Sequence, residues 1–326
     1  MKKILALSLA FAIFFVPRFH AGAYESDDAV EHYLIVGFDA AAQNTDVIAV
    51  VSFLPSVRKL TFLQIPRDTY YDFGGVQNKL NQLYPFVLAG RKDKAAKEEA
   101  MDTLRDAVSA MLGVRIDRYV GVAIDDFSAM VDLIGGLPVK LKRDLVYSDQ
   151  KSGEKKVLSA GEQILNGSAA LAFIRYRAGY ASGDLGRLDA QKTFISALLS
   201  KLASGSSLRG IVLSCLELRE SCVTDFPLFQ ALRFGKRFLS EYSSLDIRYL
   251  TLPGEPCMHG GISYYVANKR SSEEAIRSFL CFGTASPDFD AERRLVYPKS
   301  SVIMEIYSRN AVNYHVYTDT ELRLGS

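Results

Sequence analysis

Three arginines and an acid gather around one bend of the chain. Arg175 and Arg177 are followed by a Gly-rich stretch, which leads to Asp184 and Arg187. Arg175 and Arg177 are two residues apart, so their side chains point the same way only where the chain is extended. Several guanidinium groups near a helix amino terminus match the oxygens of a phosphate. The residue types therefore predict a phosphate or pyrophosphate site, against the simpler alternative of a solvated basic loop.

The segment after this bend must hold the charged groups in place. Its apolar side chains recur at helical spacing, which predicts a helix from Leu188 with one face on a core. Arg187 and Gln191 are four residues apart and share a face, and Asp184 has the position of an N-cap. The Ala-rich run before the arginines predicts another helix, which ends near Ile174.

A second group of charged residues follows predicted strands nearer the amino terminus. An α/β sheet presents ligands at its strand ends. A single loop acid usually caps a turn, but carboxylates beside an arginine and a phosphate suit Mg²⁺. Short apolar runs predict strands at residues 33–36, 47–53 and 59–65, and the acids at their ends are Asp39, Asp46 and Asp68, the last beside Arg67.

Strand and helix patterns alternate along the rest of the chain, which predicts an α/β core flanked by helices. Gly113 should end a helix at 98–112, and a capping box of Ser159 and Glu162 should start the short helices before Ile174. Beyond residue 282, alternating apolar residues at 302–307 predict a small β-containing tail. The other expected elements are strands at 119–124 and 246–252 and helices at 127–134, 208–218, 227–239 and 271–280.

The amino terminus has the pattern of an export signal. Two lysines precede a largely apolar run over residues 4–16, and Ala21-Gly22-Ala23 invites cleavage after Ala23. The run is shorter than the roughly 20 residues that span a bilayer, and an uncleaved anchor is the alternative. The remaining chain is thus expected outside the cytoplasm, where at least one disulfide should form among its four cysteines. The expected parts are residues 1–23, a catalytic domain over 30–282 and the tail over 283–326.

Composition and missing motifs exclude several other functions. The formal net charge of +2 gives no steering toward nucleic acid. The chain has no C-x-x-C or H-E-x-x-H motif, which argues against a zinc site. It also lacks the G-x-S-x-G motif of serine hydrolases.

Together these motifs resemble the LytR-CpsA-Psr family of extracytoplasmic glycopolymer ligases, over roughly residues 33–280. Each motif alone is weak, but their order and spacing are specific. The motifs are Asn44-Thr45-Asp46-Val47-Ile48, Ile65-Pro66-Arg67-Asp68-Thr69, Lys79-Leu80-Asn81, Leu133-Ile134-Gly135-Gly136-Leu137, Leu165-Asn166-Gly167 with Ala170-Leu171, Arg175-Tyr176-Arg177, and Asp184-Leu185-Gly186-Arg187 with Gln191.

The resemblance implies a three-layer α/β/α fold, with a central mixed sheet flanked by helices and a hydrophobic pocket for a polyprenyl chain. It also implies a bound Mg²⁺ and a reaction at the outer face of the cytoplasmic membrane. There, a phosphoglycan such as teichoic acid or capsule would pass from a polyprenyl (undecaprenyl) pyrophosphate carrier to peptidoglycan.

Carried over to this sequence, the resemblance assigns three sets of residues. The metal ligands would be Asp39, Asp46 and Asp68. The catalytic residues would be Arg67, Asp68 and Asp184, where Asp184 either orients an arginine or accepts the proton of the incoming hydroxyl. The pyrophosphate would be bound by Arg67, Arg175, Arg177, Arg187 and Gln191, with Asn44 and Lys79 beside them.

Two positions depart from the family pattern, which usually has arginine where this chain has Asn44 and Ala190. Both changes lower the positive charge beside the phosphates. Two other functions would use the same clamp. A polyprenyl pyrophosphate phosphohydrolase would use water as the acceptor, and a lipid-carrier binding protein would catalyse no reaction.

Overall fold

The protein is built on a mixed central sheet. The computed structural model describes residues 29–39, 44–73, 76–148, 152–176, 184–204, 222–226, 238–284 and 302–324. Its seven-stranded sheet follows the order β11-β6-β1-β2-β3-β12-β15. The strands are β11 (Val223–Thr224), β6 (Arg118–Ala123), β1 (Glu31–Phe38), β2 (Thr45–Leu54), β3 (Lys59–Ile65), β12 (Asp246–Thr251) and β15 (Val316–Thr318).

The pairing of these strands determines which strand ends lie together. β1, β2 and β3 form an antiparallel meander, whereas β6 runs parallel to β1 and β12 runs parallel to β3. The carboxyl ends of β1, β3 and β6 and the amino end of β2 therefore share one edge of the sheet. All five strands predicted from the sequence are present here, within a few residues of their predicted limits.

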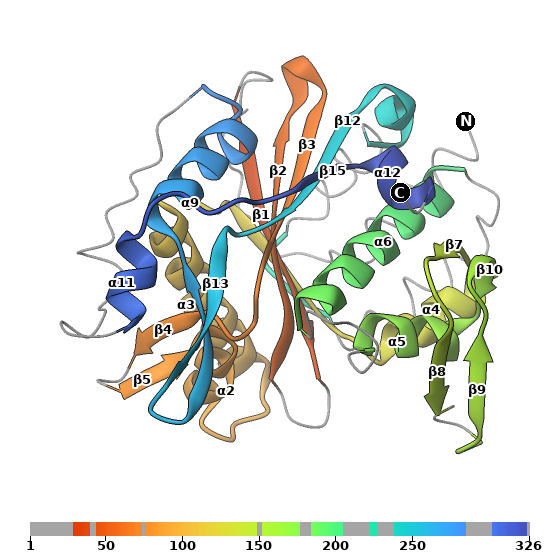
Figure 1. Ribbon diagram of the computed structural model, residues 1–326, viewed down its shortest axis with the longest axis horizontal. Coiled ribbons are helices and arrows are strands. Elements are labelled where there is room, and N and C mark those ends of the chain that lie inside the picture. The colour runs from red at the N-terminus through yellow and green to blue at the C-terminus, as the bar shows by residue number, and fades with distance from the viewer. Residues whose placement is uncertain are drawn as a thin grey trace.

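Helices cover both faces of the sheet (Figure 1). Alternating strand residues divide between the faces, so that Leu34 and Val36 join a core with α3 while Tyr33 and Ile35 face α6. The three-layer α/β/α architecture is confirmed. On one side lie α2 (Leu83–Leu88), α3 (Lys94–Leu112), α9 (Lys269–Ala275) and α11 (Val302–Ser308); on the other lie α4 (Asp126–Leu133), α5 (Gly167–Arg175) and α6 (Asp184–Ala203).

Local capping explains where several helices begin and end. The Asp93 carboxylate accepts a hydrogen bond from Ala96 N at the start of α3, and Gly113 ends α3 with φ at 67°. The capping box expected at Ser159 and Glu162 is wrong, because residues 161–165 pair with β7 as a strand. The cap of α5 is Asn166, whose Oδ1 accepts from Ala169 N at 2.9 Å. α6 begins at Asp184 itself, so this residue is the first in the helix and not its N-cap.

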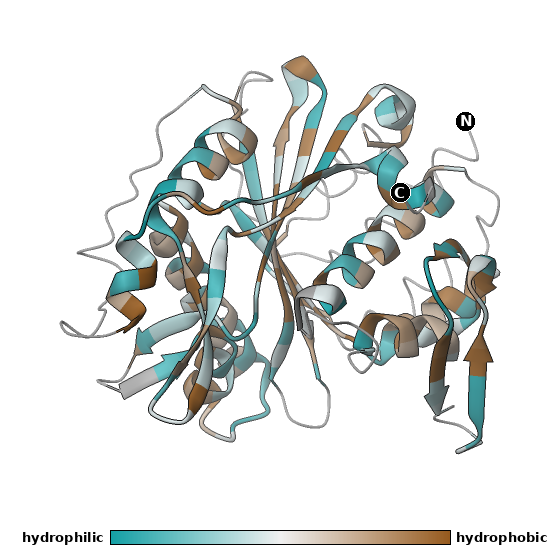
Figure 2. Ribbon diagram, in the orientation of Figure 1, coloured by the Kyte–Doolittle hydropathy of each residue, from teal (hydrophilic) through white to brown (hydrophobic). Residues whose placement is uncertain are grey.

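Four two-stranded sheets flank the central sheet in the described part of the chain. The sequence patterns did not predict most of these strands, which are short and partly exposed. Figure 2 shows both hydrophobic and hydrophilic residues on these short strands and on the flanking helices. Three are hairpins of consecutive strands, β4 (Tyr70–Phe73) with β5 (Val76–Lys79), β8 (Leu145–Ser148) with β9 (Lys155–Leu158), and β13 (Gly254–His259) with β14 (Ile262–Ala267). The fourth pairs β7 (Leu137–Leu141) with β10 (Gly161–Leu165), on either side of β8 and β9 in the chain.

Residues 302–324 pack closely on the sheet and on α6. The expected strand at 302–307 is wrong, because Ile303, Ile306 and Tyr307 are buried at helical spacing in α11. The β character of the tail lies instead in β15, which forms the edge of the central sheet. The last helix is α12 (Asp319–Leu324). Short 3-10 segments occur at Pro55–Val57, Leu80–Gln82 and Tyr242–Ser244, and a π-helical turn at Ile276–Leu280 extends α9.

Several sequence predictions fall on residues outside the described part. These are the export signal within residues 1–28, the helix at 208–218 and most of the helix at 227–239. No helix in the described ranges is long and apolar enough to cross a bilayer. Cys257 and Cys281 are free, buried thiols, and Cys215 is outside the described part, so the expected disulfide stays a prediction.

A buried histidine should make the fold sensitive to acid. His32 is 8% exposed, and its burial lowers the pKa of the ring from 6.5 to about 4. The folded state thus binds fewer protons than the unfolded chain between these values, and stability falls as the pH drops through this window. Between about pH 7.5 and about pH 5, the wild type should lose about 2 kcal/mol more unfolding free energy than His32→Asn. Urea denaturation at both pH values measures this difference, and parallel curves for the two proteins would contradict it.

Candidate functional site

Acids and bases meet at the shared edge of the sheet. Asp39 follows β1, Asp46 is the second residue of β2, and Arg67 and Asp68 follow β3. The antiparallel register places Gly37 opposite Val47 and Ile48 opposite Ile65, so these positions belong to neighbouring strand ends. The sequence prediction that the three acids lie at strand ends is confirmed.

Arg67 lies between two carboxylates at this edge. Its Nη1 donates to Asp46 Oδ1 at 2.5 Å, and its Nε lies 3.8 Å from Asp68 Oδ2. Lys79 Nζ reaches the other oxygen of Asp68 at 3.0 Å. The Nε of Arg67 is buried and has no hydrogen-bond partner among the described residues. Such an unsatisfied buried donor is costly, and an anionic ligand would satisfy it.

The turn after β3 is held rigidly by backbone hydrogen bonds. Thr69 Oγ1 donates to Pro66 O at 2.6 Å, and Leu80 N donates to Thr69 O at 2.8 Å. Asn81 N also donates to Arg67 O at 3.2 Å. Because β4 and β5 begin and end beside this turn, the hairpin fixes the positions of Arg67 and Lys79 relative to one another.

Further arginines come from the helical layer. Arg175 ends α5, and its Nη2 donates to Asp125 Oδ1 at 2.8 Å, just after β6. Arg187 is only 4% exposed in the first turns of α6. Gln191, one turn later, is 5% exposed and lies on the same side of the helix. The predicted roles of Arg177 and of the Asp184 side chain fall outside the described part, and Asn44 is placed by its backbone, whose O accepts from Asp39 N at 2.9 Å.

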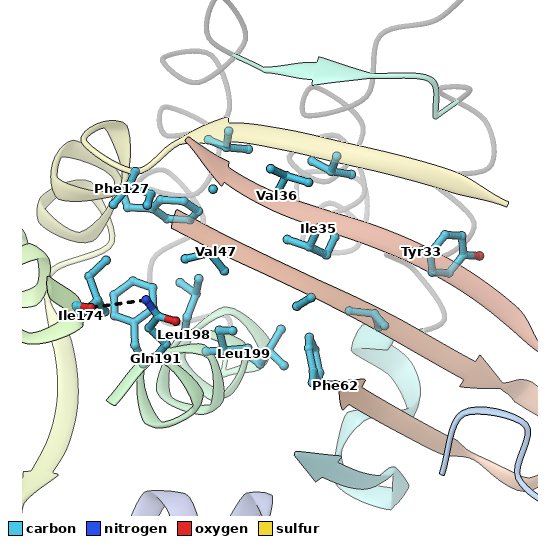
Figure 3. A pocket seen from close by; sticks show the side chains of 18 of the residues that line it. Tyr33, Ile35, Val36, Val47, Phe62, Phe127, Ile174, Gln191, Leu198 and Leu199 are labelled. Carbon is cyan, nitrogen blue, oxygen red and sulfur yellow. Dashed lines mark hydrogen bonds between the residues drawn. The ribbon is translucent and has the colours of Figure 1, made fainter. Parts of the chain in front are cut away.

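An apolar cavity of about 240 Å³ lies between the sheet and α6 (Figure 3). Strand residues such as Ile35, Val47 and Phe62 form one wall, and Phe127 and Leu198 belong to the other. Apolar lining of this kind suits a hydrocarbon chain. The resemblance to the family implied such a pocket. In the sequence, the pocket is indicated by apolar residues on both faces of the central strands, including the face toward α6.

Two residues of the cavity wall are chain neighbours of residues at the charged edge. Val47 lines the cavity and follows Asp46, while Ile174 lines it and precedes Arg175. Gln191 is the polar group at this end, where its Oε1 accepts from Gln64 Nε2. The apolar cavity therefore lies close to the charged residues along the chain at β2 and at the end of α5.

The carboxylates offer oxygen ligands for a hard cation. Among the described residues, no group of three or more His, Cys, Asp and Glu side chains is arranged to hold a metal ion. Mg²⁺, however, usually takes one or two carboxylates and completes its shell with water and phosphate oxygens. Asp46 and Asp68, on either side of Arg67, fit that requirement.

Two site residues were not predicted from the sequence. Asp125 comes shortly after the end of β6, and Asp46 and Asp68 likewise lie at or near the ends of their strands. The same pattern, an acid at a strand end, could therefore have predicted Asp125 from the sequence. Gln64 lies inside an apolar strand, where the sequence gives no sign of its partner. Ala190 is buried on the opposite side of α6, where it lines a second cavity of about 230 Å³. Position 190, where the resemblance implied an arginine, therefore adjoins this second cavity and is not part of the wall of the apolar cavity.

The fold and site thus combine an α/β/α scaffold, a charged strand edge and an apolar cavity between the sheet and α6. The chain belongs to the LytR_cpsA_psr family, whose model matches residues 20–278.

Curated relatives agree with this assignment. The polyisoprenyl-teichoic acid--peptidoglycan teichoic acid transferase TagV of Bacillus subtilis is 28% identical over 242 residues, and TagU of Bacillus cereus is 30% identical over 254 residues. The matches cover 72% of this chain and 59% of TagV, and 76% of this chain and 78% of TagU. The chain therefore spans about three fifths of the length of TagV.

Solved structures share the fold. The structure of TagT bound to LI-WTA has a TM-score of 0.62 at 22% identity, over 80% of this chain and 95% of TagT. The structure of B. subtilis TagV has a TM-score of 0.58 at 22% identity, over 78% of this chain and 98% of that structure.

Arg67, which lies between Asp46 and Asp68, should control anion binding. Arg67→Ala removes a donor and leaves Asp46 and Asp68 facing the ligand without it, so affinity for inorganic pyrophosphate should fall at least about tenfold. Calorimetric titration of the purified protein measures this loss. Arg91→Ala is the control, because Arg91 is exposed and forms an ion pair of 2.9 Å with Glu99, not with Asp46 or Asp68. Equal affinities of the two variants for pyrophosphate would show that Arg67 does not bind the anion.

Proposed function

We propose that this protein transfers a phosphoglycan from a polyprenyl pyrophosphate carrier to peptidoglycan. The observation that carries the proposal is an apolar cavity whose wall residues Val47 and Ile174 directly adjoin Asp46 and Arg175 in the chain. The cavity would hold the isoprenoid chain, and the edge would hold the pyrophosphate. The similarity to TagV and TagU, which are named as polyisoprenyl-teichoic acid--peptidoglycan teichoic acid transferases, supports the same donor and acceptor.

The reaction requires one bond to form and one to break. An acceptor hydroxyl oxygen attacks the phosphorus that bears the glycan, and the bridging P–O bond of the pyrophosphate breaks. Polyprenyl phosphate leaves with the electron pair of that bond. The hydroxyl proton passes to a carboxylate base, for which Asp184, at the start of α6, is the proposed residue.

The protein contributes chiefly position and charge. Phosphoryl transfer needs neutralisation of the phosphate oxygens, and Arg67, Lys79, Arg175 and Arg187 are the described cations that would supply it. We assign Asp46 and Asp68, with Asp39 close by, to a Mg²⁺ ion. When bound, such an ion would neutralise further charge on the phosphates. The apolar walls exclude water from the carrier end of the site, which favours transfer over hydrolysis.

The proposed compartment follows from the substrate. A polyprenyl carrier is held in the membrane, and peptidoglycan lies outside it. The protein would therefore act at the outer face of the cytoplasmic membrane, to which the signal or anchor at residues 1–23 would direct it.

A transfer assay tests the arginine clamp. Arg177→Ala and Arg177→Lys should each lower the transfer of labelled polymer by about 10²-fold to 10³-fold, because lysine cannot reproduce a two-pronged guanidinium contact. Arg309→Ala, which alters an exposed arginine paired with Glu255, should retain full transfer. Release of free glycan phosphate would instead indicate a hydrolase, and binding without any product would indicate a carrier-binding protein.

Metal removal tests the acidic residues separately. Excess EDTA should abolish transfer, and added Mg²⁺ should restore it. Asp46→Asn should lower transfer by about 10²-fold or more, with a melting temperature close to that of the wild type. Undiminished turnover in EDTA would disprove the metal assignment and leave the arginine clamp untouched.

A further inference from the structure

Gln64 is a buried amide at the junction between the cavity and the charged edge. It is 4% exposed, and it lies on the face of β3 that also carries Leu60 and Phe62, both of which line the apolar cavity. Its Nε2 donates to Gln191 Oε1, across the gap from the sheet to α6. Its own Oε1 is buried and accepts no hydrogen bond from the described residues. An unsatisfied buried acceptor costs stability, so stability alone does not account for this side chain.

The bond from Gln64 fixes which way the Gln191 amide faces. Gln191 Nε2 donates to Ile174 O at 3.5 Å, as Figure 3 shows. A carbonyl oxygen can only accept, so the nitrogen of Gln191 must point toward Ile174 and its oxygen toward Gln64. The contact at 3.5 Å is at the outer limit of a hydrogen bond, so the NH₂ group of Gln191 is held only weakly.

The same chain of hydrogen bonds joins the three elements that carry the arginines. Gln64 lies three residues before Arg67 on the β3 side, and Ile174 lies directly before Arg175 in α5. Gln191, between them, lies one helical turn after Arg187 in α6. A substitution of Gln64 would therefore affect the positions of the arginines through Gln191.

We propose that Gln64 is a positioning residue for the pyrophosphate, which holds the oxygen of Gln191 away from the site and turns its NH₂ group toward the phosphate oxygens. This inference rests on the proposed function. If the Gln191 amide turned over, its carbonyl oxygen would face the anion and repel it. Gln64 thus acts on the donor through Gln191 and not by direct contact.

The first test removes the amide without enlarging the core. Gln64→Leu should weaken the binding of geranylgeranyl pyrophosphate about tenfold and raise the donor KM by a similar factor, with the acceptor KM unchanged. Its melting temperature should stay near that of the wild type, because the unsatisfied Oε1 disappears together with the bond to Gln191. Combined with Gln191→Leu, the substitution should add no further loss, since both variants break the same contact.

Thr61→Val is the matched control. Thr61 is fully buried on the same strand, its Oγ1 also has no hydrogen-bond partner in the described part, and it faces the opposite layer. This variant should bind the donor like the wild type. If Gln64→Leu behaves like Thr61→Val, or if its loss adds to that of Gln191→Leu, the proposal is wrong.

A second variant, Gln64→Glu, should reverse the orientation of the Gln191 amide instead of removing the hydrogen-bonding partner of that amide. The carboxylate in Gln64→Glu would accept from Gln191 Nε2 and turn the amide oxygen toward the phosphate, so donor binding should fall further than in Gln64→Leu. Protonation of this carboxyl restores a donor, so the ratio of variant to wild-type affinity should recover as the pH falls. A ratio independent of pH would contradict the proposed orientation. Failure of the wild type to bind geranylgeranyl pyrophosphate would instead count against the proposed function itself.

Discussion

The site depends on the antiparallel pairing of β1, β2 and β3. This pairing brings Asp46 and the turn with Arg67 and Asp68 to one edge, although the residues lie more than twenty positions apart. A slip of one residue would send Val47 and Ala49 to the other face of the sheet and remove them from the cavity. The ion pairs and the apolar wall thus follow from a single register.

α6 connects the two halves of the site. One side of this helix supplies Phe194 and Leu198 to the apolar cavity, and its first turns carry Arg187 and Gln191. The carrier lipid that we propose has the same division between an apolar chain and a charged head. Binding energy from the chain can therefore be used to hold the pyrophosphate against the arginines.

The carboxyl-terminal segment holds α6 against the sheet. Asp319 Oδ1 accepts from Ser196 Oγ at 2.6 Å and from Tyr249 OH at 3.0 Å, and its Oδ2 pairs with Arg323 Nε at 3.0 Å. These contacts join α12, α6 and β12 in one network. Residues 302–324 therefore help to fix the position of a helix whose first turns form the site.

The sequence by itself determined the central strands, the family and the acids at strand ends. Short apolar runs and local motifs depend only on residues that are close together in the sequence. The sequence misassigned Ser159 with Glu162 and the segment at 302–307, because local patterns there fit both a helix and a strand. Pairing with β7 made residues 161–165 a strand, and burial at helical spacing accompanies the helix at 302–308. The tertiary structure alone decided that Arg67 lies between Asp46 and Asp68, that Arg175 pairs with Asp125, and that Gln64 meets Gln191. Such contacts join distant parts of the chain, and their geometry depends on strand register and helix packing.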